Sequence, residues 1–348
     1  MAYGDATGND ALAIRDILRG MGYKSEIYAE FIGSRLENEK IMKFEKMSLK
    51  PDDVLIYHMS VGSRLSYLIE TFKCKKIMIY HNITPSNYFL GYDIISVAAT
   101  KKGLDEVRYL NNKFDYCLAD SEYNKQDLIE YGYTCDIDVL PIVVPFSDYE
   151  KKPSKVVLRK YTDSMTNLLF VGRVVPNKKI ENIIAAFYHY QKKFNPISRL
   201  FLVGHWNGME RYKSKLDEYI KVLGINNIVF TGHIKFDEIL AYYRLADVFV
   251  CMSEHEGFCV PLVEAMFFDI PIVAASHAAV PYTLGGSGIL LDEESPLLAA
   301  GAIDLMVTDT SLRKVVIDAQ RNRLNDFSHA VVKSQFETYV GDFLRGER

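Results

Sequence analysis

The sequence predicts an α/β fold of two doubly wound domains that face a central cleft. Strand-like apolar runs alternate with helix-like periodic runs from end to end, which is typical of parallel sheets covered by helices. The 348 residues are many for a single hydrophobic core. A polar, Lys-rich stretch from Pro145 to Ser164 is the best linker candidate. We therefore expect one domain at residues 1–150, a second at 151–326, and a C-terminal helix at 327–348 that packs back on the first.

The first half has the less regular pattern. Its predicted strands are Ser25–Ala29, Val54–Tyr57, Lys76–Tyr80, Tyr116–Ala119 and Ile137–Val143. Its predicted helices are Ala11–Met21, Arg64–Phe72, Asp93–Leu110 and Lys125–Tyr131. A Rossmann-like domain normally opens with a strand, yet only Met1-Ala2-Tyr3 precede the first glycine-containing loop. Either that strand is absent or the chain is truncated.

The second half repeats the alternation with sharper boundaries. Its predicted strands are Asn167–Val171, Leu200–Val203, Ile228–Thr231, Val248–Met252, Ile270–Ala275 and Gly288–Leu291. Its predicted helices are Ile180–Phe194, Met209–Leu223, Asp237–Leu245, Pro261–Phe268, Ser295–Val307 and Ser311–Leu324. Two similar sheets that face each other would bind a ligand between their carboxyl ends.

Charge and cysteine content narrow the class of protein. Residues 1–150 carry 17 Lys+Arg against 23 Asp+Glu, and the remainder carries 24 against 22, so neither half has the basic bias of a nucleic-acid binder. The five cysteines lack metal-binding spacing and fit a reducing compartment. No apolar run reaches the length of a membrane span. We expect a cytoplasmic protein. The basic and apolar stretch Arg35–Lys50 would allow a peripheral contact at the inner face of the membrane, but it also holds Glu37, Glu39 and Glu45, which favours a solvated helix face.

The run from Ser253 to Met266 is the most informative motif. It follows a predicted buried strand, and Pro261 suits the start of the next helix. Backbone N–H groups of the loop would face an anion at this helix start. Glu256 in the loop and Glu264 in the helix could accept hydrogen bonds from hydroxyl groups. The motif therefore favours a ligand with a phosphate and many hydroxyls, such as a nucleotide sugar.

Two cations follow the first predicted strand of the second half. Gly172-Arg173 ends that strand, and Lys178 comes five residues after Arg173. Arginine offers a bidentate fork and lysine a point charge, so together they suit a diphosphate. Either cation alone would be read as a solvated loop residue, but the pair, in the same domain as Glu256, favours function.

Other signals are weaker when each is taken alone. The run Gly4–Asp10 permits close backbone approach to a phosphate before a helix, although Thr7, Asn9 or Asp10 could simply cap that helix. His81 follows a buried strand and could reach sugar hydroxyls, or it could be structural. His58 has the same geometry and a weaker case. Two glycine positions after second-half strands, Gly204 and Gly232-His233, could admit a nucleobase or merely open turns.

These motifs together resemble the retaining glycosyltransferases of family 4, which have the GT-B fold. The resemblance rests on Val171-Gly172-Arg173 with Lys178, and on Glu256-Gly257-Phe258, Pro261-Leu262 and Glu264-Ala265-Met266, the family's E-x7-E motif. It covers the whole second half. In the first half it rests on the Gly4/Gly8 loop, on His81 and on Asp120-Ser121.

The resemblance implies a role for each matching residue. Arg173 and Lys178 would neutralise the donor diphosphate, Glu256 would hold hydroxyls of the donor sugar, and Glu264 would accept from the ribose. His81 would contact the donor sugar from the other domain. The remaining positions that we expect to contact donor or acceptor are Gly4, Gly8, Gly172, Gly232, His233, Gly257, Phe258, Cys259, Val260 and Leu262.

The implied reaction is sugar transfer with retention at the anomeric carbon. The donor would be a UDP-, GDP- or ADP-linked sugar, and the acceptor a glycan, a lipid-linked glycan or a small molecule. We expect no metal or other cofactor, because two cations are available for the diphosphate; the Asp136-Ile137-Asp138 run begins a strand, and we assign it no metal. The alternatives are a nucleotide-sugar epimerase of the same architecture and a non-catalytic nucleotide-sugar-binding protein.

Overall fold

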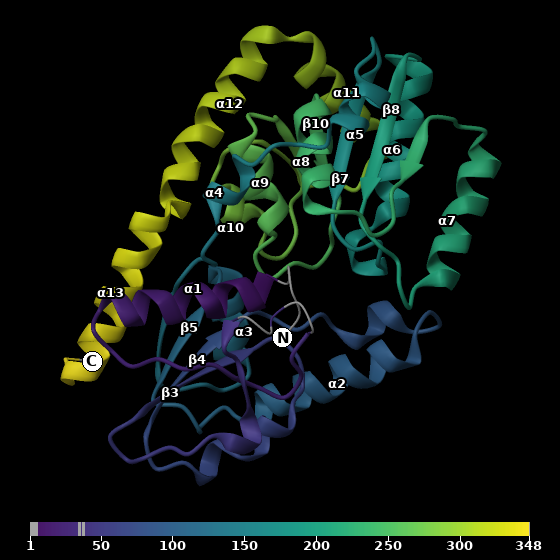
Figure 1. Cartoon of the computed structure of the whole chain (residues 1–348). Coiled ribbons are helices and arrows are strands. Elements are labelled where there is room, and N and C mark those ends of the chain that lie inside the picture. Colours follow the sequence, from purple (N-terminus) through teal and green to yellow (C-terminus); the bar gives the residue numbers. More distant parts are fainter. Residues whose placement is uncertain (1–5, 34–35, 37–38, 348) are drawn as a thin grey trace. The chain divides into compact units, whose positions relative to one another are not determined.

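A computed structural model describes residues 6–33, 36 and 39–347, and its contacts divide the chain into two compact units (Figure 1). The first unit comprises Met1–Asn87, Ile95–Val144 and Phe327–Arg348. The second comprises Tyr88–Ile94 and Pro145–Asp326. Each unit is built on its own parallel sheet.

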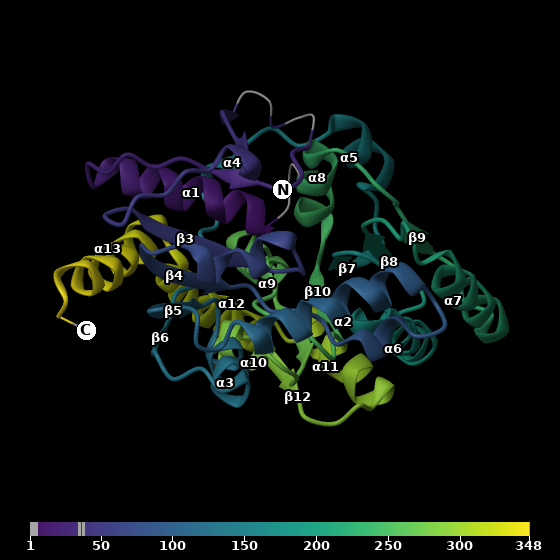
Figure 2. The same cartoon turned by 90° about the horizontal axis from the view of Figure 1, so that it is seen from below.

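The first unit contains a four-stranded parallel sheet in the order β3-β4-β5-β6, whose strands follow one another across the unit in Figure 2. The strands are β3 (Val54–Met59), β4 (Lys75–Tyr80), β5 (Tyr116–Ala119) and β6 (Asp136–Val139). Their carboxyl ends are in register, since Met59 pairs with Tyr80 and Tyr80 with Ala119. Residues that directly follow these strands therefore meet at one edge of the sheet. A separate two-stranded ladder joins β1 (Tyr28–Ala29) to β2 (Met42–Lys43).

Helices cover both faces of this sheet because its strands alternate buried side chains between two cores. One core joins Ile77 and Ile79 of β4 to helices α1 (Ala6–Gly20) and α13 (His329–Arg345). The other joins Met78 and Tyr80 to helices α2 (Ile94–Tyr109) and α3 (Glu122–Glu130). Helices α1 and α13 come from opposite ends of the chain and share one core (Figures 1 and 2).

The second unit contains a six-stranded parallel sheet in the order β12-β11-β10-β7-β8-β9. The strands are β7 (Thr166–Val171), β8 (Ser198–Val203), β9 (Ile228–Phe230), β10 (Val248–Cys251), β11 (Ile272–Ala275) and β12 (Ile289–Leu291). The first strand of the unit, β7, lies beside the fourth, β10, so the chain winds outward in both directions from this pair. Ligands bind at such a switch point in open α/β sheets.

The inner strands β8, β10 and β11 of the second sheet are buried at every position, and β7 is buried at all but its two ends, which requires cover on both faces. Helices α6 (Ile180–Lys193) and α11 (Pro296–Thr308) pack together, and α11 contacts β10, β11 and β12. Helix α8 (Phe236–Leu245) contacts β7 and β8, and α9 (Val260–Phe267) contacts β11 and α12 (Thr310–Leu324). Helix α7 (Glu210–Leu223) contacts α6.

The predicted α/β class with parallel sheets is confirmed, and the corrections are local. The predicted helix Arg64–Phe72 is two short 3₁₀ segments, η3 (Arg64–Tyr67) and η4 (Ile69–Thr71). The predicted strand Ser25–Ala29 shrinks to β1. The predicted linker holds helices α4 (Phe146–Tyr149) and α5 (Lys155–Tyr161), since Ser154 caps α5 through a bond from Val157 N. Helix α10 (Val280–Leu284) has no counterpart in the sequence prediction.

None of the described helices combines the length and the apolar character that crossing a bilayer requires. The stretch Arg35–Lys50, which suggested a contact with a membrane surface, lies partly outside the described residues.

The packing of α13 in the first unit gives a stability prediction. Phe336 of α13 is fully buried among residues of α1, β4 and β5. Phe336→Ala should therefore lower the free energy of unfolding by about 3–5 kcal/mol. Urea denaturation measures this loss. The control Val331→Ala, on the same helix but 38% exposed, should change the stability by less than about 1 kcal/mol. Equal effects of the two variants would contradict this packing.

Candidate functional site

The candidate site of the second unit lies at the carboxyl ends of β7 and β10, the two strands at its switch point. The loop after β7 carries Arg173 and Lys178, and the loop after β10 carries Glu256. Register pairing sets Leu169 of β7 beside Phe249 of β10, so both loops leave the same edge. The two sequence motifs, some 80 residues apart in the chain, are adjacent in the structure for this reason.

A buried ion pair joins the two loops. Lys178 Nζ pairs with Glu256 Oε2, and the side chains are only 19% and 9% exposed. Burial opposes the charged form of Lys178, but Glu256 raises the pKa of the ammonium above its ordinary value. Asn177 adds two hydrogen bonds: its side-chain Nδ2 donates to His255 O at 3.0 Å, and its backbone carbonyl accepts from Glu254 N at 2.9 Å.

The start of α9 is set by an unusual backbone conformation at Cys259. Its φ of 72° is in the left-handed region, which non-glycine residues rarely adopt. The preceding loop is anchored by the segment around α10: Ala279 N donates to Glu256 O, and Thr283 Oγ1 donates to Phe258 O. Helix α9 begins at Val260, one residue before Pro261. Of the predicted contact residues here, Phe258, Cys259 and Leu262 are buried, whereas Gly257 and Val260 are partly exposed.

Arg173 is an exposed cation with no hydrogen bond or ion pair to any described residue. It follows Gly172, and the next two strands also end in glycines, Gly204 and Gly232, all with positive φ. A Cβ on Gly204 would lie 1.9 Å from Gly172 O, so only glycine permits this approach of the two backbones. Because these glycines have no side chains, a ligand can approach the backbone at this edge, next to the Arg173 guanidinium. This arrangement is suited to an anionic ligand.

Two histidines lie near Arg173 at the same edge. His205 follows Gly204, and the predicted His233 follows Gly232; their ring centroids are 6.2 Å apart. Burial, Arg173 and His233 lower the pKa of His205, so its ring is neutral at pH 7. His233 itself is exposed. His205 can donate or accept a hydrogen bond there without adding charge.

Glu264 is a partly buried carboxylate held by two tyrosines. Tyr149 Oη donates to Oε1 at 2.8 Å, and Tyr243 Oη donates to Oε2 at 2.5 Å. Burial raises the pKa of Glu264, and the two hydroxyls partly offset this. A carboxylate oxygen accepts about two hydrogen bonds, so each oxygen keeps capacity for a ligand hydroxyl. Tyr149 belongs to α4, inside the stretch that sequence reasoning treated as a linker.

Sequence reasoning also missed the segment Tyr88–Ile94, which belongs to the second unit although it lies in the first half of the chain. Tyr88 lies on His255 with ring centroids 6.1 Å apart. Burial lowers the pKa of Arg173, and Asp93 partly offsets this. Burial lowers the pKa of His255 to about 4, so the ring is neutral at pH 7.

The first unit gathers a second polar cluster at the carboxyl edge of its sheet. His81 follows β4 and lies between two partners: Nδ1 is 2.8 Å from Asp120 Oδ2, and Nε2 is 2.9 Å from His58 Nδ1. Asp10 of α1 approaches both rings, with Oδ2 at 3.8 Å from His58 Nδ1 and 3.9 Å from His81 Nε2. Burial raises the pKa of Asp10 to about 6 and lowers the pKa of His58. Both ring nitrogens of His81 are therefore engaged within the unit.

The predicted glycine loop before the first helix is corrected in part. Helix α1 already begins at Ala6, so Gly8 lies inside its first turn and is buried. Gly4 lies outside the described residues. The helix extends five residues further toward the N-terminus than the predicted Ala11–Met21. Gly8 is a poor helix former, so its burial in the packed unit outweighs its intrinsic propensity here.

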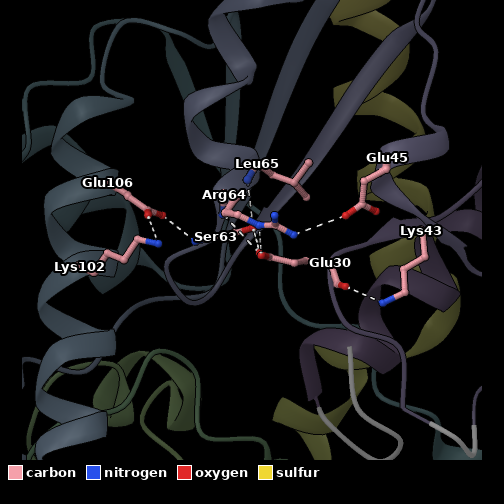
Figure 3. Close-up of polar contacts among 8 residues, drawn as sticks. All are labelled: Glu30, Lys43, Glu45, Ser63, Arg64, Leu65, Lys102 and Glu106. Carbon is pink, nitrogen blue, oxygen red and sulfur yellow. Dashed lines mark hydrogen bonds and ion pairs between the residues drawn. The ribbon is translucent and has the colours of Figure 1, made fainter.

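The loop that follows β3 is fixed by two carboxylates (Figure 3). Glu106 Oε2 accepts from Ser63 N and Ser66 Oγ, both at 2.7 Å. Glu30 accepts from Ser63 Oγ at 2.9 Å and from Arg64 Nε at 2.6 Å. The carboxylates occupy donors that would otherwise attract an anion, so this turn supports the end of β3 rather than binding a phosphate.

The buried ion pair yields a prediction that does not depend on activity. Lys178→Met and Glu256→Leu should each destabilise the fold, since either leaves one charge buried without its partner. The double variant should recover about 1–3 kcal/mol relative to the sum of the singles. A double-mutant cycle from urea unfolding measures this coupling. The exposed pair Lys314–Asp318 on α12 is the control and should couple by less than about 0.5 kcal/mol. A coupling no larger than the control's would contradict a shared buried pair.

Comparisons with known proteins agree with this geometry. The family model described as glycosyl transferases group 1 matches residues 158–323. An uncharacterized glycosyltransferase of Methanocaldococcus jannaschii is 29% identical over 220 residues, which are 62% of this chain and 55% of the relative. The D-inositol 3-phosphate glycosyltransferase of Corynebacterium kroppenstedtii is 26% identical over 66% of this chain and 54% of its own length. The chain thus spans about half the length of the curated relatives it matches.

Similarity to solved structures extends over both units. Anabaena HepE, solved in complex with UDP and glucose, has a TM-score of 0.74 and 17% identity, with 98% of each chain covered. At this identity the similarity establishes the fold alone, which is that of the GT-B glycosyltransferases. The switch-point loops and the Lys178–Glu256 pair lie within residues 158–323, the part of the chain that matches the family model of the group 1 glycosyl transferases.

Proposed function

We propose that this protein is a retaining glycosyltransferase that moves a sugar from a nucleotide-sugar donor to a hydroxyl acceptor without a metal at the diphosphate. The observation that carries the proposal is the pairing of Lys178 with Glu256 at the switch point, next to the unpaired Arg173. Lys178 is already held beside the Glu256 carboxylate, and Arg173 has no partner among the described residues. Two cations fixed in place before the ligand binds are suited to stabilise a diphosphate.

In the proposed reaction, the donor's anomeric C–O bond to the diphosphate breaks while a bond to the acceptor oxygen forms on the same face. The acceptor hydroxyl proton passes to the leaving phosphate oxygen. Arg173 and Lys178 stabilise the charge that develops on the diphosphate, and Glu256 holds hydroxyls of the donor sugar. Glu264, oriented by Tyr149 and Tyr243, accepts from the ribose hydroxyls. The protein then acts mainly by positioning and charge stabilisation.

The donor base, the sugar and the acceptor need a direct screen. We propose UDP-, GDP- and ADP-linked sugars as donor candidates, and a glycan or a lipid-linked glycan as acceptor. A thermal-shift panel of UDP, GDP, ADP and their sugars identifies the base, because a bound ligand stabilises the folded state according to its occupancy. Incubation with donor alone then separates transfer from epimerisation, which needs no acceptor. Saturable binding without turnover toward any acceptor would instead indicate a non-catalytic binder.

The unpaired guanidinium leads to a kinetic prediction. Arg173→Ala should lower turnover by about 10²–10³-fold, and at least as much as it lowers donor affinity, because charge on the leaving group peaks in the transition state. Steady-state kinetics with the donor found in the screen give kcat and KM. Arg159→Ala, which removes an exposed cation from α5 of the same unit, is the matched control and should leave both unchanged. Unchanged turnover in both Arg173→Ala and Lys178→Ala would refute the assignment of these cations.

The Glu264 carboxylate leads to a binding prediction. Glu264→Ala should weaken binding of the free nucleoside diphosphate by about 10–100-fold, since hydrogen bonds to a charged group contribute about 1.5–3 kcal/mol. Isothermal titration calorimetry measures the change. The same variant should bind the corresponding 2′,3′-dideoxy nucleotide as tightly as the wild type does. Normal affinity of Glu264→Ala for the natural nucleotide would rule out a ribose contact.

A further inference from the structure

The cluster at the carboxyl edge of the first unit is not used by the proposed transfer chemistry. Asp10 comes from α1, His58 from β3 and His81 from the residue after β4, so three separate elements each direct one ligand atom to the same point. The side chains of Asp10 and His81 are 3% exposed and that of His58 is 17% exposed. Groups this polar are rarely gathered in a protein interior without a common partner.

The separations of the three ligand atoms fit a bound ion. His58 Nδ1 and His81 Nε2 are 2.9 Å apart, and Asp10 Oδ2 lies 3.8 Å and 3.9 Å from them. A tetrahedral Zn²⁺ with bonds of about 2.0–2.1 Å sets its ligand atoms about 3.3–3.4 Å apart. One of the three observed separations is shorter than this value and two are longer. Shifts of about half an ångström would bring all three atoms to bonding distance from one ion.

The neighbours of the cluster are those that a metal site needs. Asp120 Oδ2 lies 2.8 Å from His81 Nδ1, so the carboxylate accepts the Nδ1 proton and leaves the Nε2 lone pair directed at the cluster. Asp10 Oδ1 accepts from Val143 N at 2.9 Å, which leaves Oδ2 for the ion. The loop after β3, held by Glu30 and Glu106, fixes the chain just beyond His58 (Figure 3).

We propose that Asp10, His58 and His81 form a binding site for a divalent transition-metal ion of the zinc class, with Asp120 orienting His81. A site of two imidazoles and a carboxylate binds zinc-class ions in preference to Mg²⁺ or Ca²⁺. Three protein ligands leave a fourth position for water or a substrate oxygen, as in open zinc sites. All three proposed ligands and Asp120 belong to the first unit.

The alternative for the same atoms is a plain hydrogen bond between the two histidines. In that state His58 Nδ1 donates to His81 Nε2, so both lone pairs cannot face an ion together. In the metal-bound state the His58 proton resides on Nε2 instead. The two states therefore differ in a measurable way, which is the affinity of the full chain for a metal.

Metal binding to the full chain tests the proposal without reference to activity. After treatment with a chelator, calorimetric titration with Zn²⁺ should show one site per chain, and Co²⁺ should give the visible d–d bands of a tetrahedral N/O site without thiolate charge-transfer bands. Asp120→Asn should weaken Zn²⁺ binding by about 10–100-fold. His58→Ala and Asp10→Ala should weaken it further, because each removes a ligand.

Two control variants exclude other groups as the source of the signal. Among the described residues, Cys251, Glu256 and Cys259 also bring possible ligand atoms together, so Cys251→Ser must keep the tight site. His205→Ala, which removes a histidine of the second unit, must keep it as well. Circular dichroism checks the fold of each variant, and His58→Gln replaces any alanine variant that unfolds. Absence of a tight site in the wild type, or its survival in both His58 variants, would overturn the proposal, whereas loss of transferase activity alone would not bear on it.

Discussion

The buried pair of Lys178 and Glu256 is the interaction on which the candidate donor site depends. It joins the loops of the two strands at the switch point, and Asn177 binds the same loops through their backbones. A buried ion pair of this kind contributes little net stability, but removal of one partner leaves a charge that the interior cannot solvate. Both charges, on Lys178 and on Glu256, are therefore needed to keep the two loops in this geometry. This arrangement holds a cation in a fixed position without a bound ligand, which is what preorganised stabilisation of a leaving group requires.

Backbone conformations elsewhere in the second unit fix the positions of these loops. Gly204 allows its strand end to approach Gly172 where any side chain would collide, and Cys259 takes a left-handed conformation that starts α9 at the correct point. Thr283 and Ala279 then anchor the intervening loop. These positions have no chemistry of their own, yet they decide where Glu256 and Glu264 lie.

The first unit uses its sheet edge differently. Its cluster of Asp10, His58, His81 and Asp120 engages both ring nitrogens of His81 within the unit. The side chain that sequence reasoning assigned to the donor sugar contacts His58 and Asp120 within the unit, and its contact with a sugar stays a prediction. A metal ion at this cluster would explain why two histidines and a carboxylate are buried together with an orienting carboxylate behind them.

The α/β class, most strands of the second unit and the candidate residues Arg173, Lys178, Glu256 and Glu264 could be predicted from the sequence, because alternating periodicity and residues at strand ends are local signals. Tertiary structure alone decided their partners. Tyr149, Tyr243 and Glu264 meet from three elements, and Asp10, His58 and His81 from three others, although nothing in their sequence spacing signals contact. The 3₁₀ turns at Arg64–Thr71 likewise depend on the distant Glu30 and Glu106. Local propensity cannot encode these features, since each is fixed by groups that only folding brings within hydrogen-bonding distance.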